Sequence, residues 1–141
     1  MSIVKHSIDL ATAQAAIEAA VAKATELGLR MSIAVCDEAG HPKATVSMDG
    51  ASISSIQIAL DKAYTSAVSR RATHAWFEGI KNDPPLLHGI VHTPRLVVFG
   101  GGFPIKEGDQ TVGSIGISGG HYSQDMECAR AALAAIGAAE G

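Results

Sequence analysis

Charged residues are scarce in this chain, in which Lys, Arg, Asp and Glu make up 18% of 141 residues, against about 25% in an average globular protein. The formal net charge is −3 and no run of basic residues occurs, which argues against nucleic acid as a partner because a phosphate backbone requires a basic stripe. Aromatic residues are only 4% of the chain, so a base-stacking surface is poorly supported. With so few charges to cover its surface, we expect the protein to hide part of it in a homo-oligomer.

Signals for membranes and for disulfide bonds are also missing. The first ten residues contain no apolar core of a signal peptide, and no apolar run approaches the roughly 20 residues of a membrane span. Of the two cysteines, Cys36 and Cys128, neither belongs to a C-x-x-C pair or a Cys/His cluster. We therefore expect a cytoplasmic protein without a membrane partner that packs both thiols in reduced form.

The length is typical of one domain and short for two, so we predict a single domain over residues 1–141. Apolar residues at helical spacing follow several capping residues and predict helices there. A proline-rich stretch behind the second long helix predicts an irregular loop. The predicted helix caps are Ser7 or Asp9, Ser54 and Ser123, with one further short helix near residues 75–80.

Five segments show the composition and alternation of β-strands and are joined by turn residues. Hairpin turns place neighbouring strands antiparallel, and the apolar face of such a sheet must be covered by helices. We therefore predict an α+β fold with a five-stranded antiparallel sheet and packed helices. The predicted strands are residues 31–37, 42–48, 96–99, 103–106 and 111–118.

A glycine-rich turn follows the last predicted strand. Gly116-Ile117-Ser118-Gly119-Gly120 matches the G-x-S-x-G pattern of serine hydrolases, but that fold needs an acid and then a histidine well downstream. Here the only later histidine is His121, which is too close in sequence. Free N–H groups and the positive end of the next helix would instead favour a carboxylate at Gly119 and Gly120. A tight turn without a ligand is the alternative.

Among the six histidines, His121 stands beside that turn. It is therefore a candidate haem iron ligand or general acid/base, although it could also be an ordinary exposed residue. His88 and His92 are four residues apart and would share one helix face, but the prolines around them argue against a helix. A zinc site there would also need a third ligand.

Lys62 lies on a predicted helix among small and apolar residues. An ammonium group in that setting can pair with a carboxylate, bind an anion or carry a proton. An ion pair is the default reading, and the other two roles make Lys62 a candidate for the functional site.

Five ordered motifs resemble the GlcG/HbpS family of haem-binding proteins, which includes the C-terminal domains of PduO-type proteins. No single motif is decisive, but together with the first helix and hairpin they span nearly the whole chain in the right order. The motifs are MDGA at 48–51, IALDKA at 58–63, GGGFPI at 100–105, VGSIGISGG at 112–120 and QDMECA at 124–129.

The resemblance implies a profilin-like sheet, homo-oligomers up to an octamer and haem binding, with haem degradation or sensing in some members. Other members accompany operons for the breakdown of small molecules. This chain departs from the family at His121, where a small residue is usual, and again across residues 88–92.

Two functions follow. In the first, the protein binds haem or another small molecule, and His121, which we expect to open into a cavity with a main-chain floor, ligates the iron. In the second, it is a small catabolic enzyme that acts on a carboxylated intermediate, with His121 moving a proton and Lys62 or Arg71 holding the carboxylate. The candidate catalytic residues are His121 and Lys62, and the candidate ligand-binding residues are Asp49, Arg71, His88, Gly102, Phe103, Gly119 and Gly120.

Overall fold

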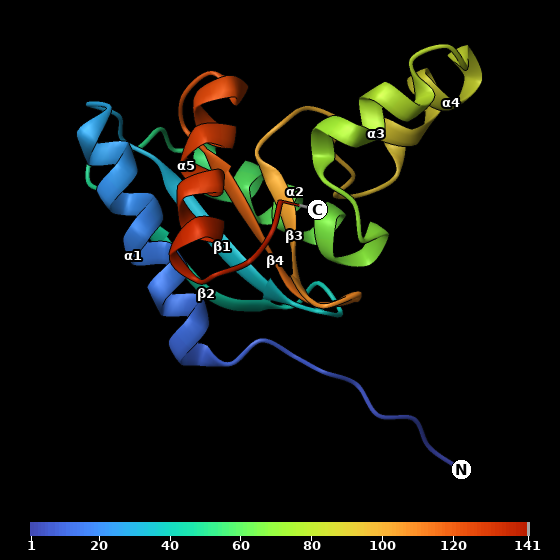
Figure 1. The fold of residues 1–141 in the computed structure, drawn as a ribbon. Helices are drawn as coiled ribbons and strands as arrows, with labels where there is room; N and C mark the ends of the chain where they lie inside the picture. Colours follow the sequence, from blue (N-terminus) through green and yellow to red (C-terminus); the bar gives the residue numbers. More distant parts are fainter. Residues whose placement is uncertain (141) are drawn as a thin grey trace.

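An antiparallel sheet with the strand order β2-β1-β4-β3 forms the centre of the protein, and helices cover both of its faces (Figure 1). The computed structural model describes residues 1–140. The strands are β1 (Ser32–Asp37), β2 (Pro42–Ser47), β3 (Gly102–Glu107) and β4 (Gln110–Ser118).

Three long helices make the two outer layers. Helices α1 (Leu10–Glu26) and α5 (Tyr122–Ala135) lie together on one face of the sheet, and α2 (Ser55–Ser69) lies on the other (Figure 1). The chain between α2 and β3 forms an arm that projects away from the sheet. That arm contains α3 (Thr73–Ile80), α4 (Pro84–Gly89) and a 3₁₀ turn (Ile90–His92).

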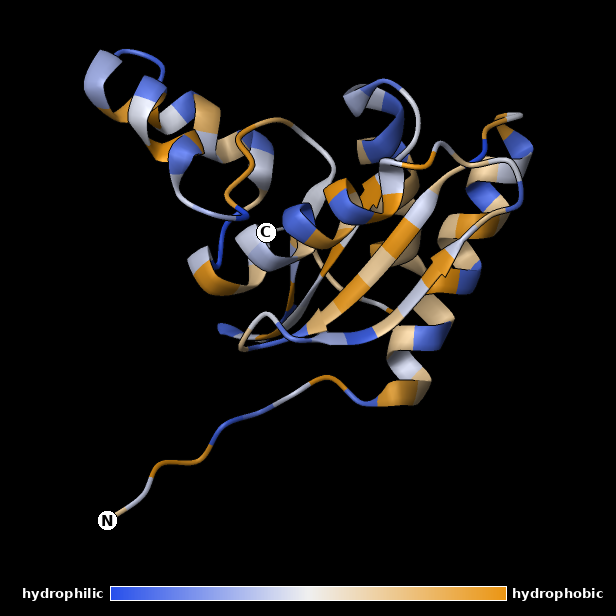
Figure 2. Cartoon of the chain, turned by 180° about the vertical axis from the view of Figure 1, so that it is seen from behind, coloured by the Kyte–Doolittle hydropathy of each residue, from blue (hydrophilic) through white to orange (hydrophobic). Residues whose placement is uncertain are grey.

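The middle strand β1 shows how the sheet separates two cores. Successive side chains of a strand point to opposite faces, so Ile33 and Val35 join the large core under α1 and α5. Ala34 and Cys36 join a smaller core against α2. In Figure 2 the apolar positions lie along these central strands and also on the α3–α4 arm, while the N-terminal residues run away from the body.

Helix α2 packs unusually close to β4 because Gly116 has no side chain. A Cβ atom at Gly116 would collide with the carbonyl oxygen of Ala59 and lie 2.5 Å from the backbone nitrogen of Ala63. On the same strand, the hydroxyl of Ser114 donates to the carbonyl of Ala63 at 2.6 Å. Gly116 therefore allows helix α2 to lie in close contact with the sheet.

The sheet has four strands among residues 1–140, so the predicted fifth strand at residues 96–99 is wrong. Arg95 has a left-handed backbone (φ 66°), which breaks the extended path before this segment. The backbone then bonds to a side chain of α2: the hydroxyl of Thr65 donates to the Arg95 carbonyl, and the N–H of Val97 donates to that hydroxyl. A side chain of α2 thus makes the hydrogen bonds that a neighbouring strand would have made. The profilin-like fold stays a prediction.

Of the predicted helix caps, Asp9 is confirmed, Ser54 stands at the predicted N-cap position but without a side-chain hydrogen bond, and Ser123 is wrong. Asp9 caps α1 by accepting from the N–H of Thr12 at 2.7 Å, and these hydrogen bonds lower the pKa of Asp9. Ser54 makes no side-chain cap on α2. Helix α5 is capped by His121 and not by Ser123.

The proline-rich loop is more regular than predicted. Pro84 occupies the first turn of α4, where a missing N–H costs no hydrogen bond, and Asp83 caps that turn by accepting from the N–H of Leu86. Prolines that exclude a long helix therefore begin a short one here.

Both cysteines are buried free thiols, in the predicted strand and the predicted helix. Burial raises the pKa of Cys36 and of Cys128 to about 11, which keeps both thiols protonated and unreactive near neutral pH. None of the helices in residues 1–140 is long and apolar enough to cross a membrane.

Gly116→Ala tests the close approach of α2 to β4. The new methyl group must push two backbones apart, so we expect unfolding free energy to fall by about 3 kcal/mol, measured by urea denaturation. Gly89→Ala is the matched control, because a Cβ there meets nothing within 4 Å. Equal stability of the two variants would contradict this account of the glycine.

Candidate functional site

A cavity of about 400 Å³ lies where α3 meets the segment before β3 and the start of α5. This volume is at the lower end of small-molecule sites, which combine apolar walls with a few polar groups. Its walls follow that pattern. The lining residues are His74, Phe77, Glu78, Val98, Phe99, Gly100 and Tyr122.

His74 is the only histidine among these lining residues. Its Nδ1 is buried and has no hydrogen-bond partner among the described residues, which is costly for a polar atom unless something else satisfies it. One side of the imidazole faces the core, with its centroid 5.5 Å from that of the Phe103 ring. No local pattern in the sequence distinguishes His74 from the other histidines; the packing of α3 does.

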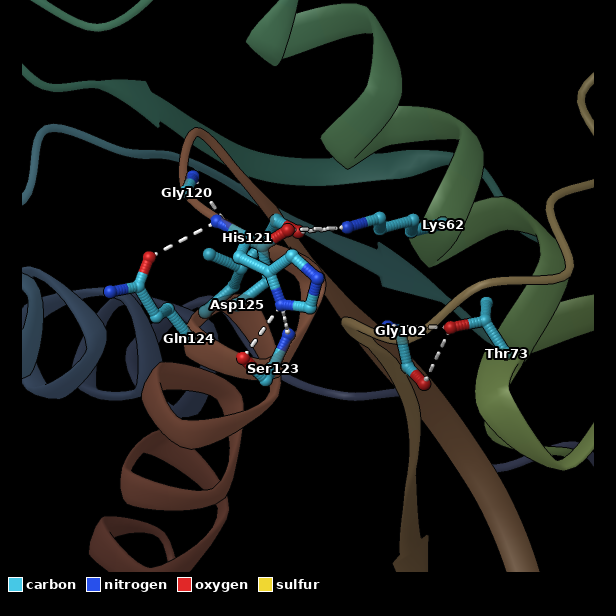
Figure 3. Close-up of polar contacts among 9 residues, drawn as sticks. Lys62, Thr73, Gly102, Gly120, His121, Ser123, Gln124 and Asp125 are labelled. Atoms are coloured by element: carbon cyan, nitrogen blue, oxygen red, sulfur yellow. Dashed lines mark hydrogen bonds and ion pairs between the residues drawn. The ribbon is translucent and has the colours of Figure 1, made fainter.

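The fully buried ammonium of Lys62 and the carboxylate of Asp125 form an ion pair beside this cavity (Figure 3). The Nζ atom of Lys62 donates to Oδ2 of Asp125 at 2.7 Å and to the carbonyl of Ile117 at 2.8 Å. The same Nζ lies 4.9 Å from the centre of the Phe99 ring, which lines the cavity. The pair therefore joins α2, β4 and α5 directly behind one cavity wall.

Burial acts on both groups of the pair. It lowers the pKa of the Lys62 ammonium and raises the pKa of the Asp125 carboxyl, while the attraction between the two groups opposes each shift. Oδ1 of Asp125 is also satisfied, since it accepts from the N–H of Gly120 at 3.1 Å. The chain passes the ammonium at Gly101, where φ is +122° and a Cβ would lie 2.6 Å from Nζ.

His121 is exposed and does not line this cavity. Its Nδ1 accepts from the N–H of Ser123 at 3.2 Å and caps α5 (Figure 3). An accepting Nδ1 leaves the ring proton on Nε2 in the neutral form. Ligation of iron through Nε2 would move that proton to Nδ1, which could then no longer accept from the N–H of Ser123. The ring stacks on Tyr122, a cavity residue, with centroids 4.1 Å apart.

Two N–H groups of the glycine turn before α5 already have hydrogen-bond acceptors within the protein. The N–H of Gly120 donates to Asp125, and the N–H of His121 donates to Oε1 of Gln124 at 3.1 Å. Gly119 has φ +141°, and a Cβ there would lie 2.6 Å from the carbonyl of Arg30. Backbone geometry thus explains Gly119, and a Cβ at Gly120 would lie 2.7 Å from Oε1 of Gln124. The ligand contacts of both glycines stay a prediction.

Two of the predicted ligand residues lie next to the cavity wall but inside the core. The N–H of Gly102 donates to the hydroxyl of Thr73 at 3.0 Å (Figure 3), and a Cβ at Gly102 would lie 2.6 Å from the Lys62 carbonyl. Phe103 is fully buried. Both residues support the cavity from behind and do not form its lining.

The other predicted ligand residues lie elsewhere. Arg71 is exposed with its guanidinium 5.4 Å from the Trp76 ring centre. Asp49 is exposed in a separate hollow that Arg30 also lines. His88 and His92 are exposed on the arm, and residues 1–140 contain no group of three metal-ligating side chains.

Residues 8–134 match the family model described as "Haem degrading protein HbpS-like". The chain therefore belongs to the HbpS-like family, as its ordered motifs indicated. A relative from Citrobacter freundii, described as an uncharacterized 15.0 kDa protein in the dhaT-dhaS intergenic region, is 35% identical over 129 residues, which cover 90% of each protein.

Solved structures agree with this membership. The crystal structure of the Klebsiella pneumoniae protein ORFY has a TM-score of 0.91 and 33% identity, and the match covers 99% of this chain and 97% of that one. A complex of PduOC with haem has a TM-score of 0.87 and 29% identity, covering 95% of this chain and 98% of that one. Haem is thus bound by a protein of the same fold.

Lys62→Met tests the ion pair behind the cavity. Leaving the Asp125 carboxylate buried without its cation should lower the unfolding free energy by about 3–5 kcal/mol, measured by chemical denaturation.

Lys62→Met combined with Asp125→Asn is the matched control, because it removes both charges and keeps an acceptor for Gly120. The double variant should be more stable than Lys62→Met alone. A single variant as stable as the unmodified protein would contradict the pairing.

Proposed function

We propose that this protein binds haem, or a planar aromatic ligand of similar chemistry, in the cavity between α3 and residues 98–100. The observation that carries the proposal is an apolar, aromatic cavity lined by a histidine whose buried Nδ1 has no hydrogen-bond partner among residues 1–140. Family membership and a haem complex of the same fold support the choice of ligand.

The residues present fit such a group. Phe77, Val98 and Phe99 offer apolar surface to a flat ring, and Gly100 brings bare main chain to the cavity wall. A haem would supply a redox-active iron that a protein side chain can bind. We assign His74 as the residue that holds the iron.

His121 is the alternative iron ligand. It stands at the cavity rim next to Tyr122, but its imidazole already caps α5. A cap is worth about 1 kcal/mol, and it would be lost if ligation through Nε2 moved the ring proton to Nδ1. His74 carries no such structural duty in the hydrogen-bond network.

The enzyme alternative has one supporting observation. The buried Lys62–Asp125 pair has opposed pKa shifts, and such pairs can carry a proton in acid/base catalysis. In that reaction His121 would act from the rim, where its capping hydrogen bond limits its freedom to turn. Binding of a ligand requires no such movement, so it remains the function that the geometry favours.

We further propose that the protein forms a homo-oligomer. Several apolar side chains of α2 and the arm are two-fifths or more exposed, and a large exposed apolar patch marks an interaction surface. They include Val68, Phe77, Leu86 and Val91.

Light scattering after size-exclusion chromatography tests this proposal. We expect a mass several times the 14.5 kDa of one chain, and Leu86→Glu combined with Val91→Glu should lower it, because two buried carboxylates would be unpaired in the contact. A monomer at micromolar concentration would contradict the proposal.

Haemin titration tests the ligand site. We expect a saturable shift of the Soret band, and His74→Ala should weaken haemin binding about tenfold or more because it removes the iron's protein ligand. The shift and the dissociation constant are read from absorbance spectra.

His121→Ser is the matched control, since serine keeps a helix cap while the imidazole is removed. We expect its haemin spectrum to resemble that of the unmodified protein. Loss of the Soret shift in His121→Ser with retention in His74→Ala would move the iron ligand to His121. No shift in the unmodified protein would end the haem proposal.

A further inference from the structure

The buried ammonium of Lys62 has one unused donor. An ammonium group carries three N–H bonds, and the acceptors within reach are Oδ2 of Asp125 and the carbonyl of Ile117. The remaining neighbour is the π face of Phe99, whose centre lies 4.9 Å from Nζ. A ring face satisfies a buried cation less well than an oxygen acceptor does.

Phe99 is placed to cover this donor from the cavity side. Its side chain lines the cavity and is 46% exposed, while Lys62 is fully buried. Phe99 immediately precedes three glycines, and the first backbone bond to the sheet beyond it is made by the carbonyl of Gly101, which accepts from the N–H of Ile117 at 3.0 Å. The ring can therefore swing out without breaking the sheet.

The surroundings suit an anion on the other side of Phe99. Both oxygens of Asp125 are already occupied, one by Lys62 and one by the N–H of Gly120. Asp125 also lies in the first turn of the 14-residue helix α5, whose positive end favours negative charge. An oxygen of an anion placed at the third N–H of Lys62 would thus find a hydrogen-bond donor and the favourable electric field of the α5 N-terminus.

We propose that the cavity ligand carries a carboxylate, that this carboxylate displaces the ring of Phe99, and that it hydrogen-bonds to Nζ of Lys62. Lys62 is then a binding residue for the ligand, and Phe99 is the movable cover that keeps the ammonium dry when the cavity holds no ligand. This inference rests on the proposed function, since it uses the same cavity.

Acetylation of lysines by an amine-reactive ester, followed by peptide mass spectrometry, tests the cover. Lys81, whose side chain is 44% exposed, is the internal reference for reagent activity. Relative to Lys81, modification of Lys62 should be slow in the unmodified protein and about tenfold faster in Phe99→Ala, because local opening limits access.

Phe77→Ala is the matched control, because Phe77 lines the same cavity and no contact joins it to Lys62. The buried thiols of Cys36 and Cys128 report on global opening in the same samples. A faster reaction of Lys62 in Phe99→Ala with unchanged thiol labelling supports the cover. An unchanged rate, or an equal increase in Phe77→Ala, overturns it.

The carboxylate is tested with 2-naphthoate and its uncharged methyl ester as probes. We expect 2-naphthoate to protect Lys62 from acetylation in Phe99→Ala and to bind about tenfold more tightly than the ester. The preference should vanish in the double variant Lys62→Met, Asp125→Asn. Equal binding of acid and ester, or a preference that survives in the double variant, overturns the inference.

These outcomes separate the two proposals. If haemin causes no Soret shift while 2-naphthoate still protects Lys62, the haem proposal fails and the carboxylate site stands. If haemin binds through His74 while acid and ester behave alike, the haem proposal stands and the role of Lys62 fails.

Discussion

The ion pair between Lys62 and Asp125 is the contact on which the arrangement of the site depends. Its ammonium comes from α2 on one face of the sheet and its carboxylate from α5 on the other, with a carbonyl of β4 between them. A buried pair stabilises a fold little more than apolar side chains of the same volume would, but breaking it is costly. Its effect is therefore to hold the cavity wall in one position.

Glycine makes that arrangement possible. Gly116 lets α2 reach the sheet, and Gly101 lets the chain pass the ammonium. A methyl group at either position would push apart the elements that carry the two charges. The glycine-rich motifs of the sequence thus act through packing, and the polar groups they bring together form the site.

Much of the fold could be predicted from the sequence, because hydrophobic alternation, turn residues and Asp9 as a cap are local signals. The fifth strand could not be excluded in this way, since residues 96–99 are apolar and look like a strand locally. What replaces the strand is distant in sequence: the hydroxyl of Thr65 bonds to the Arg95 carbonyl and to the N–H of Val97. Of the candidate site, Lys62 was predicted from its apolar setting. His74 and Phe99 were not predicted, because they come together only when α3 packs against a segment that is distant in the sequence.

The central claim is that the ligand lies between α3 and residues 98–100. A crystal structure of the protein grown with haemin tests it most directly. We expect electron density for the porphyrin in this cavity, with the iron bound to His74 and the ring of Phe99 moved away from Lys62. Porphyrin density at the turn of Gly119 and Gly120, with the cavity unchanged, would contradict it.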